Sequence, residues 1–503
     1  MQLSRRHFLR TSGSIGTVVL GLREARAWFN EPGEGTTTPV KSPFLAGNFA
    51  PVHEEVTADH LEILGKLPAE LRGMFVRNGP NPQFTPTGNY HWFDGDGMLH
   101  GVRLEDGQAS YRNRYVRTAG WQEEREAGKA LYGGLTDPVD VKRLFQGKPL
   151  FKNAANTALV WHDGRLLALW EGGPPTEIRV PELETVGLHT YGGKLRHAFT
   201  AHPKVDPVTG EMLFFGYSAM SPLVHYSVVN PSGELVRTTP IKMRRPVMMH
   251  DFAVTERYSI FMDLPAEFHV GPGNEGQPML QFERDHGSRF GIVPRHGAAG
   301  DVRWFESPAC FVFHTVNAYE DGDDVVLLAC RTPDYPDMLQ LQGARPPAGS
   351  NPLAGGTSAL YRWRFNLKSG QTREEALDDT PSELPRVDDR RLGRQTRFAY
   401  AMDVRMGRMI KYDLLRGTTA FHDYGAGRSG GEPVFVPRSP DAGEEDGWLI
   451  TYVFDAAEGR SEMVVVSAAE FSSPPVARVK IPARIPYGFH GTWIAADKLA
   501  QQA

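Results

Sequence analysis

The stretch WHDGRLLALW, residues 161–170, joins a tight Asp-Gly turn to a short apolar run, and this arrangement recurs along the chain. Runs of β-branched, aromatic and other apolar residues between Gly, Asp and Pro turns are typical of antiparallel strands. The same arrangement is found in DPVTGEMLFFGYS (206–218), YEDGDDVVLLACR (319–331), EEDGWLITYVF (444–454), SEMVVVSAAEF (461–471) and PPVARVKIPARIP (474–486). The sequence therefore predicts an all-β fold.

Helical patterns are scarce, and the two candidates for short helices are residues 57–71 (TADHLEILGKLPAEL) and 122–135 (QEEREAGKALYGGL). The 53 Gly and 38 Pro among 503 residues fit a chain with many turns. No change of composition appears after the first 44 residues, so residues 45–503 are expected to form a single domain. A chain of many antiparallel strands must protect its sheet edges, and a β-propeller does so by radial repetition.

The N-terminus has the features of an export signal. The segment SRRHFLR (4–10) resembles a twin-arginine signal, and a short apolar run (14–22) precedes the small-x-small sequence Ala25-Arg26-Ala27. Residues 1–27 are therefore expected to be a twin-arginine signal peptide, followed by a flexible lead-in at 28–44. The mature protein is then expected to be periplasmic, either soluble or peripheral to a membrane. A merely basic N-terminal segment is the alternative.

Composition excludes several classes of function. The net charge of −5 and the absence of a long basic run argue against a nucleic-acid partner. The two cysteines, Cys310 and Cys330, form no CxxC pair, which argues against a thiolate zinc site and a disulfide framework. Any metal must therefore be held by histidine or carboxylate.

Four of the 17 histidines have distinctive surroundings. A histidine beside apolar residues usually has a structural role, and spacing does not show whether these four converge. Because they lie far apart in the sequence, they could meet only at a shared axis, which a propeller provides. Neutral imidazole is a suitable ligand for iron. The four are found in TAHPKVDP (His202), MMHDFAVTE (His250), FHTVNAYEDGDD (His314) and YGFHGTW (His490).

With these motifs the chain resembles the carotenoid cleavage oxygenase family from about Leu67 to Trp493. Further landmarks follow in order: RGMFVRNGPNP (72–82), YHWFDGDGMLHGVRLEDGQASYRNRYVRT (90–118) and NAANTALVWHDGRLLALWEGGPP (153–175). The resemblance implies a seven-bladed β-propeller with one Fe(II) per chain on its axis. It implies that the four histidines above are the iron ligands.

The resemblance also implies supporting residues around the iron. Three glutamates, Glu171, Glu383 and Glu432, are expected to accept hydrogen bonds from ligand histidines, which fixes the imidazole tautomer. The methyl group of Thr157 is expected to face an open iron position. The plainer interpretation makes the glutamates solvated loop residues and Thr157 an ordinary strand residue. Asp94 and Asp96, in FDGDGM, are interpreted as parts of a turn with no chemical role.

The implied activity is cleavage of a carbon–carbon double bond by O2 into two carbonyl products. A carotenoid or apocarotenoid is favoured as substrate over a phenolic stilbene or phenylpropene. Phenolic-substrate members use a Tyr and a Lys, for which Tyr115 with Lys148 or Lys152 are candidates, although structural roles are the more ordinary ones for such residues. Aromatic residues next to the site could line an apolar tunnel or belong to the core: Trp170, Phe313, Tyr487 and Phe489.

Two other classes of function stay open. The first is a non-oxygenase propeller that binds a divalent cation, although such sites usually use oxygen ligands. The second is an inactive family member, which the presence of all four histidines and three glutamates argues against. A membrane-dissolved substrate would require an apolar surface patch for peripheral membrane contact, and its position is not apparent in the sequence.

Overall fold

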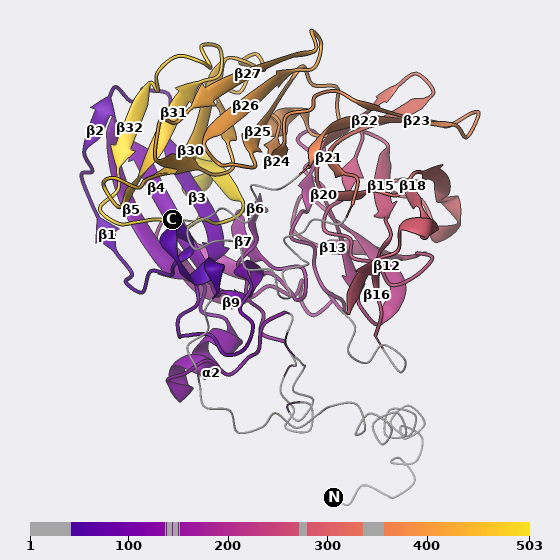
Figure 1. Ribbon diagram of the computed structural model, residues 1–503, viewed down its shortest axis with the longest axis horizontal. Helices are drawn as coiled ribbons and strands as arrows, with labels where there is room; N and C mark the ends of the chain where they lie inside the picture. The colour runs from indigo at the N-terminus through magenta and orange to yellow at the C-terminus, as the bar shows by residue number, and fades with distance from the viewer. Residues whose placement is uncertain are drawn as a thin grey trace, which may run out of the picture.

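The computed structural model describes residues 42–135, 137, 143, 149, 151–270, 279–334 and 357–502. The expected signal peptide (1–27) and most of the lead-in (28–44) lie outside the described residues. Seven antiparallel sheets surround a common axis, and Figure 1 shows them as neighbouring blades in chain order. The predicted seven-bladed β-propeller is confirmed.

Blades 1 to 7 are numbered here in chain order, with the innermost strand of each blade given first. Blade 1 contains β6 (Ala158–His162), β7 (Arg165–Leu169), β8 (Thr176–Arg179) and β9 (Glu184–Leu188). Blade 2 contains β10 (Lys204–Val205), β11 (Met212–Ser218), β12 (Ser221–Val229) and β13 (Leu235–Lys242). Blade 3 contains β14 (Ala253–Val254), β15 (Tyr258–Asp263), β18 (Ser288–Pro294) and β19 (Arg303–Ser307). Blade 4 contains β20 (Phe311–Asp321), β21 (Asp324–Thr332), β22 (Ala359–Asn366) and β23 (Thr372–Ala376).

The last three blades contain both ends of the described chain. Blade 5 contains β24 (Ser382–Arg386), β25 (Phe398–Asp403), β26 (Arg408–Asp413) and β27 (Thr418–Asp423). Blade 6 contains β28 (Arg428–Gly430), β29 (Val434–Pro437), β30 (Gly447–Asp455), β31 (Arg460–Ser467), β32 (Ala477–Lys480) and β2 (Ile63–Gly65). Blade 7 contains β33 (Gly491–Ala495), β3 (Gly73–Pro80), β4 (Gly97–Glu105), β5 (Gln108–Tyr115) and β1 (Thr57–Ala58). The pairing of β33 with β3 joins the two ends of the chain and closes the ring.

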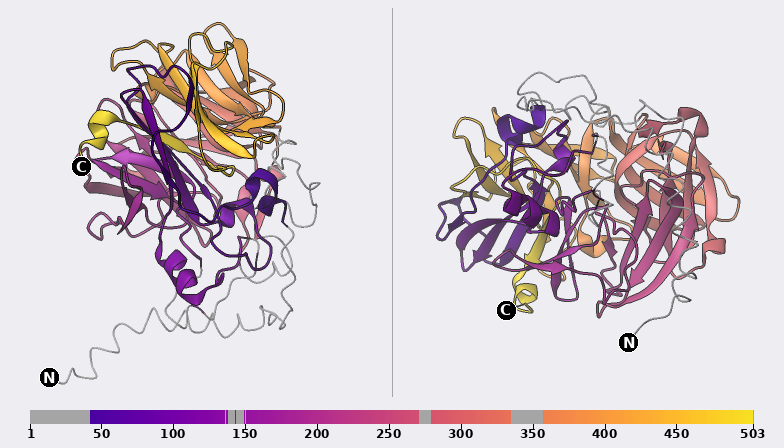
Figure 2. Two further views of the ribbon diagram at one scale, coloured as in Figure 1. Left: turned by 90° about the vertical axis from the view of Figure 1, so that its left-hand side faces the viewer. Right: turned by 90° about the horizontal axis from the view of Figure 1, so that it is seen from below.

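The remaining elements are short. β16 (Ala266–Phe268) and β17 (Leu280–Phe282) form a separate hairpin, and the α-helices among the described residues are α2 (Ala119–Ala127) and α4 (Ala496–Leu499). The 3-10 helices in the same part of the chain are η1 (Pro43–Leu45), η2 (Gly47–Phe49), η3 (Trp92–Asp94), η4 (Arg284–His286), η5 (Ala299–Asp301) and η7 (Asp389–Arg391). Figure 1 and the left view of Figure 2 show α2 and its surroundings extending beyond the sheets on one side of the molecule. Within the described residues, no helix combines the length and hydropathy needed to cross a bilayer.

Seven apolar clusters lie between neighbouring blades, one at each blade-to-blade contact. Successive strand residues point to opposite faces of a sheet, so a strand between two neighbours buries both faces. In β11, Phe214 packs toward blade 1, whereas Leu213 and Phe215 pack toward blade 3. This double burial explains why central strands such as MLFFGYS are continuous apolar runs instead of alternating ones.

The Asp-Gly turn at residues 163–164 connects β6 to β7. Asp163 and Gly164 both have positive φ, at 46° and 66°, and His162 pairs directly with Arg165. Two-residue hairpins prefer this geometry because its twist matches that of the strands, and glycine adopts it without steric cost. The turn chemistry therefore sets the register of the hairpin.

One of the two expected helices is present and the other is absent. The helix expected at 122–135 is present but shifted, because α2 begins at Ala119, after the N-cap Thr118, and ends at Ala127. Gly128 follows in a left-handed conformation. The predicted helix at 57–71 is wrong, because this segment contributes β1 and β2 as edge strands. Leu61 and Ile63 pack against the core between blades 6 and 7, and this tertiary contact outweighs the local helical preference.

Candidate metal centre

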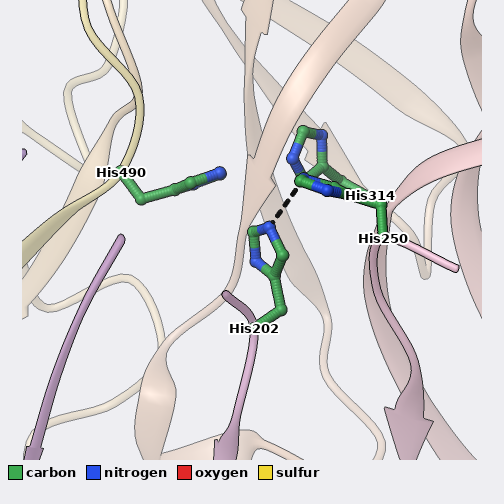
Figure 3. Close-up of side chains that lie close together, drawn as sticks. All are labelled: His202, His250, His314 and His490. Carbon is green, nitrogen blue, oxygen red and sulfur yellow. Dashed lines mark hydrogen bonds between the residues drawn. The ribbon is translucent and has the colours of Figure 1, made fainter. Parts of the chain in front are cut away.

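The four distinctive histidines lie at the inner ends of four different blades. His202 and His250 precede β10 and β14, His314 lies within β20, and His490 immediately precedes β33. The innermost strands of a propeller surround its axis, so side chains at their ends can meet across it. Figure 3 shows the four rings directed toward a common space from blades 2, 3, 4 and 7.

One ring nitrogen from each of these histidines lies within 4.8 Å of all the others. The ring centroids of His202 lie 4.5 Å from those of both His250 and His490, and His202 Nε2 is 2.9 Å from His250 Nε2. His314 Nε2 is buried and has no hydrogen-bond partner among the described residues. An unpartnered buried nitrogen is costly unless something else binds it. The cluster therefore has the character of a ligand site.

Three of the rings are held by carboxylates through their other nitrogen. The Nδ1–H of His250 donates to Glu171 at 2.8 Å, that of His314 to Glu383 at 2.6 Å, and that of His490 to Glu432 at 2.8 Å. The assignment of the proton to Nδ1 follows because an ionised carboxylate can only accept. Each Nε2 then presents its lone pair to the shared space.

The groups that hold the glutamates were missed by the sequence analysis. The Tyr217 hydroxyl donates to Glu171 at 3.1 Å, and the Ser358 hydroxyl donates to Glu383 at 2.9 Å. Arg386 contacts Glu432 at 3.4 Å, and this glutamate also accepts from the Gly491 backbone N–H at 2.8 Å. Arg386 lies in the SELPRVD motif, but its partner is 46 residues away, so spacing gives no sign of the pair.

Burial and neighbouring charges set the protonation of the rings. Burial, reinforced by the nearby rings of His490 and His250, lowers the pKa of His202 well below its ordinary value. Burial also lowers the pKa of His490, although Glu432 acts in the opposite direction. In His250 the carboxylate of Glu171 outweighs burial and raises the pKa. A metal must displace any proton from Nε2, so loading of this site is expected to release protons.

The donor set fits a first-row transition metal. Imidazole nitrogens bind such ions at about 2.0–2.1 Å, so nitrogens on opposite sides of one ion lie about 4.2 Å apart. The spread of 4.8 Å is close to that limit. Four neutral imidazoles supported by carboxylates suit iron, copper or zinc, whereas calcium and magnesium prefer oxygen ligands. The two cysteines, Cys310 and Cys330, are buried, unpaired and absent from the cluster.

A cavity of about 850 Å³ adjoins the histidine cluster. His250 and His314 are part of its wall, as are Thr157, Glu171 and Glu383. The Thr157 hydroxyl donates to Asn156, and its backbone carbonyl accepts from the His490 N–H at 3.2 Å. Many other lining residues are apolar, among them Trp92, Phe93, Met248, Phe268, Leu280 and Met402.

The four aromatic residues expected near a tunnel have different positions. Trp170, Phe313 and Phe489 line the cavity. The Phe313 ring lies edge-on to His250, with centroids 5.4 Å apart. Tyr487 is not among the described lining residues, because its ring packs on Phe49 and its hydroxyl contacts Ser429 at 2.6 Å.

The expected phenol-binding residues are also separated. Lys148 lies outside the described residues. Lys152 lines the cavity, but its ammonium group is held by Asp96 at 2.9 Å and by Glu124 at 2.8 Å. Tyr115 is not among the described lining residues, and its hydroxyl accepts from Asn81 at 2.6 Å. Asp96, interpreted from the sequence as a turn residue only, therefore has a further role as a partner of Lys152.

Comparisons with known proteins agree with this architecture. Residues 49–495 match the family model described as RPE65, retinal pigment epithelial membrane protein. A carotenoid 9,10(9',10')-cleavage dioxygenase of Pisum sativum is 41% identical over 498 residues, covering 92% of this chain and 91% of the relative. An isoeugenol monooxygenase of Pseudomonas putida is 34% identical over 474 residues, covering 90% and 98%. The crystal structure of a Pseudomonas brassicacearum lignostilbene dioxygenase superposes with a TM-score of 0.82 at 32% identity, covering 92% of this chain and 100% of that one.

Proposed function

Because the chain belongs to the RPE65 and carotenoid cleavage oxygenase family, we propose that it is a non-haem Fe(II) dioxygenase that cleaves a C=C bond of a carotenoid or apocarotenoid. The observation that carries this proposal is the four-histidine cluster at the wall of a cavity with many apolar lining residues. One alkene and one O2 give two carbonyl products, so the reaction is balanced without another co-reactant.

Ferrous iron, held by His202, His250, His314 and His490, would supply the activation of O2. The chain itself positions the alkene and excludes water. His250 and His314 face the cavity, so an alkene there lies next to the cluster. Phe313, packed on His250, gives that side an apolar wall, and Thr157 is another residue of the wall that would limit the space open to the substrate.

The lining charges favour an apolar substrate over a phenolic one. Lys152 is the residue best placed to bind a phenol from the cavity wall, but two buried carboxylates already share its ammonium group. These carboxylates use two of its three N–H donors, so a phenol could bind only through the third, and a phenolate there would meet two buried negative charges. Tyr115, the other candidate anchor, is engaged away from the cavity.

Cleavage of a phenolic stilbene or phenylpropene is the second candidate, and Lys152 in the cavity wall is the observation that favours it. Iron-loaded protein would be incubated with an apocarotenoid, with isoeugenol and with a hydroxylated stilbene, and the aldehydes identified by mass. We expect aldehydes from the apocarotenoid, with a His314→Ala variant as the inactive control. Turnover of the phenolic compounds alone would reverse the assignment. Iron-loaded protein with no turnover of any of them would contradict both candidates.

We also propose peripheral contact with a membrane, where an apolar substrate would be collected. Leu135, Phe151 and Met220 line the cavity and are 44%, 45% and 72% exposed. Apolar side chains that are both lining and exposed lie where the cavity meets solvent. Co-sedimentation with neutral lipid vesicles, compared between the native chain and a Phe151→Ser, Met220→Ser variant, tests this; equal binding by both would contradict it.

Export by the twin-arginine route remains a proposal based on residues 1–27. Replacing Arg5 and Arg6 with lysine is expected to keep the full-length precursor in the cytoplasm. Cell fractionation with antibody detection measures the distribution. Unchanged periplasmic recovery of the variant would refute this route.

A further inference from the structure

Three of the clustered histidines come from three separate sheets. His202 belongs to blade 2, His250 to blade 3 and His314 to blade 4, and each blade is a hydrogen-bonded sheet of its own. A metal site requires its ligands to be held to within about 0.5 Å, by packing together with hydrogen bonds to the surrounding residues. Hydrogen bonds that cross from blade to blade are therefore the contacts that can hold the spacing of these rings.

Asp251 accepts hydrogen bonds from two neighbouring blades. Its Oδ1 accepts from Lys204 Nζ at 2.7 Å, and its Oδ2 accepts from the backbone N–H and the hydroxyl of Thr315 at 2.8 and 2.7 Å. Asp251 directly follows His250, Lys204 lies two residues after His202, and Thr315 directly follows His314. One carboxylate therefore joins the three segments that carry these histidines.

The Asp251 carboxylate is buried, and both of its oxygens accept hydrogen bonds. Asp251 is 1% exposed, and the backbone N–H of Phe252 donates to it at 2.7 Å in addition to the three cross-blade donors. The Thr315 hydroxyl also contacts the backbone carbonyl of Phe252 at 3.2 Å. A buried carboxylate with four donors is strongly held, because each missing donor would leave charge uncompensated in the interior.

We propose that Asp251 is a positioning residue that sets the spacing of His202, His250 and His314 by bridging blades 2, 3 and 4. The inference rests on the proposed metal site and adds the element that fixes its geometry. The competing interpretation is an ordinary buried ion pair that contributes to stability alone. The two differ in whether removal of the carboxylate changes the metal geometry or only the unfolding midpoint.

The test compares cobalt binding with stability in purified, metal-free full-length protein. Asp251→Asn keeps the shape but replaces one acceptor oxygen with a donor. We expect a loss of Co(II) affinity of at least tenfold, together with a changed visible absorption spectrum of the bound Co(II). Such spectra report ligand geometry and do not respond to stability as such. Native affinity and spectrum in this variant would overturn the proposal.

Glu462→Gln is the matched control. Glu462 is also 1% exposed, and its cationic partners, including Arg478 at 2.9 Å, all lie within blade 6. We expect this variant to unfold more easily while it keeps the native Co(II) affinity and spectrum. An equal loss of Co(II) affinity in Glu462→Gln would show a general effect of stability and would overturn the proposal.

A milder pair of variants covers the case in which Asp251→Asn does not fold. Thr315→Val removes only the hydroxyl bond, whereas Thr315→Ser keeps it. We expect a weaker affinity and an altered spectrum in the valine variant and native behaviour in the serine variant; identical behaviour of the two would overturn the proposal. Failure of the native protein to bind Co(II), with His314→Ala as reference, would instead contradict the metal site itself.

Discussion

Replacement of Glu432 by glutamine tests whether the carboxylate partners of the histidines control metal binding. Glu432 is 3% exposed and has three partners: His490 Nδ1, the Gly491 backbone N–H and Arg386. Glutamine has almost the same shape but only one acceptor oxygen. Its amide N–H2 must therefore face at least one of these donors, so a favourable contact becomes a repulsive one.

The size of the effect follows from the hydrogen bond that glutamine cannot accept. One hydrogen bond to a charged acceptor contributes about 1.5–3 kcal/mol. Arg386 keeps its pair with Asp389 at 3.1 Å, so its charge is not left isolated. We therefore expect the metal-free protein to lose about 2 kcal/mol of unfolding free energy. Substitution of the partner of a ligand histidine weakens metal binding by about 10–100-fold.

Glu171→Gln is the matched variant. The Glu171 side chain is 23% exposed, so glutamine there can turn its amide toward water in the cavity. We expect it to weaken metal binding at the lower end of the same range and to lose less than about 1 kcal/mol of unfolding free energy, because a partly solvated group that loses its partner can bind water instead of staying unsatisfied. Denaturant unfolding of metal-free protein and chelator competition for Co(II) measure the two quantities separately.

Two results would refute this reasoning about the glutamates. If Glu432→Gln binds Co(II) with native affinity, the carboxylate does not make His490 a better ligand. If Glu171→Gln loses more stability than Glu432→Gln, burial and the contact with Arg386 are not what distinguishes the two glutamates.

Three further predictions concern the ligand His490, the core between blades 1 and 2, and the metal itself. His490→Ala should remove metal loading and turnover yet leave the fold intact, because the backbone bonds of residue 490 to Asn78 and Thr157 remain; circular dichroism and metal analysis check this. Phe214→Ala, which removes a fully buried ring stacked 4.0 Å from Phe199, should cost about 3–5 kcal/mol in denaturant unfolding. Chelation of the metal should lower the melting temperature of the protein, since a ligand present at 100 times its Kd stabilises the native state by about 2.7 kcal/mol. An unchanged melting temperature would show that the ion does not bind the folded state preferentially.

The strands were largely predictable from the sequence, and one segment shows why some were not. Turns such as Asp163-Gly164 and runs such as MLFFGYS indicate strands locally, because turn chemistry and burial act over a few residues. The number of blades came from the family resemblance, since no repeat is visible. The strands β1 and β2 form because β5 and β32 offer unpaired edges, and the paired residues lie 53–55 and 412–416 positions apart in the sequence.

The candidate site was likewise predictable only in part. The four histidines and three glutamates could be selected by motif, but their pairing could not, since His490 and Glu432 lie 58 residues apart. Asp251 stood in a quoted motif without a role, because its partner Thr315 is 64 residues away in another blade. The resemblance to phenolic-substrate members pairs Tyr115 with Lys148 or Lys152, and the structure gives Tyr115 and Lys152 different surroundings.

The construction of the site has a consequence for distant substitutions. The clustered histidines belong to blades 2, 3, 4 and 7, and each pair of neighbouring blades is separated by one apolar core. A volume change in the core between blades 2 and 3 moves whole sheets, because close-packed interiors transmit strain instead of absorbing it. The distance between His202 and His250 depends on that core as well as on Asp251. Residues such as Phe215 and Phe261, which touch neither the cavity nor the cluster, are therefore expected to affect metal geometry, whereas the solvent-facing edge strands are not.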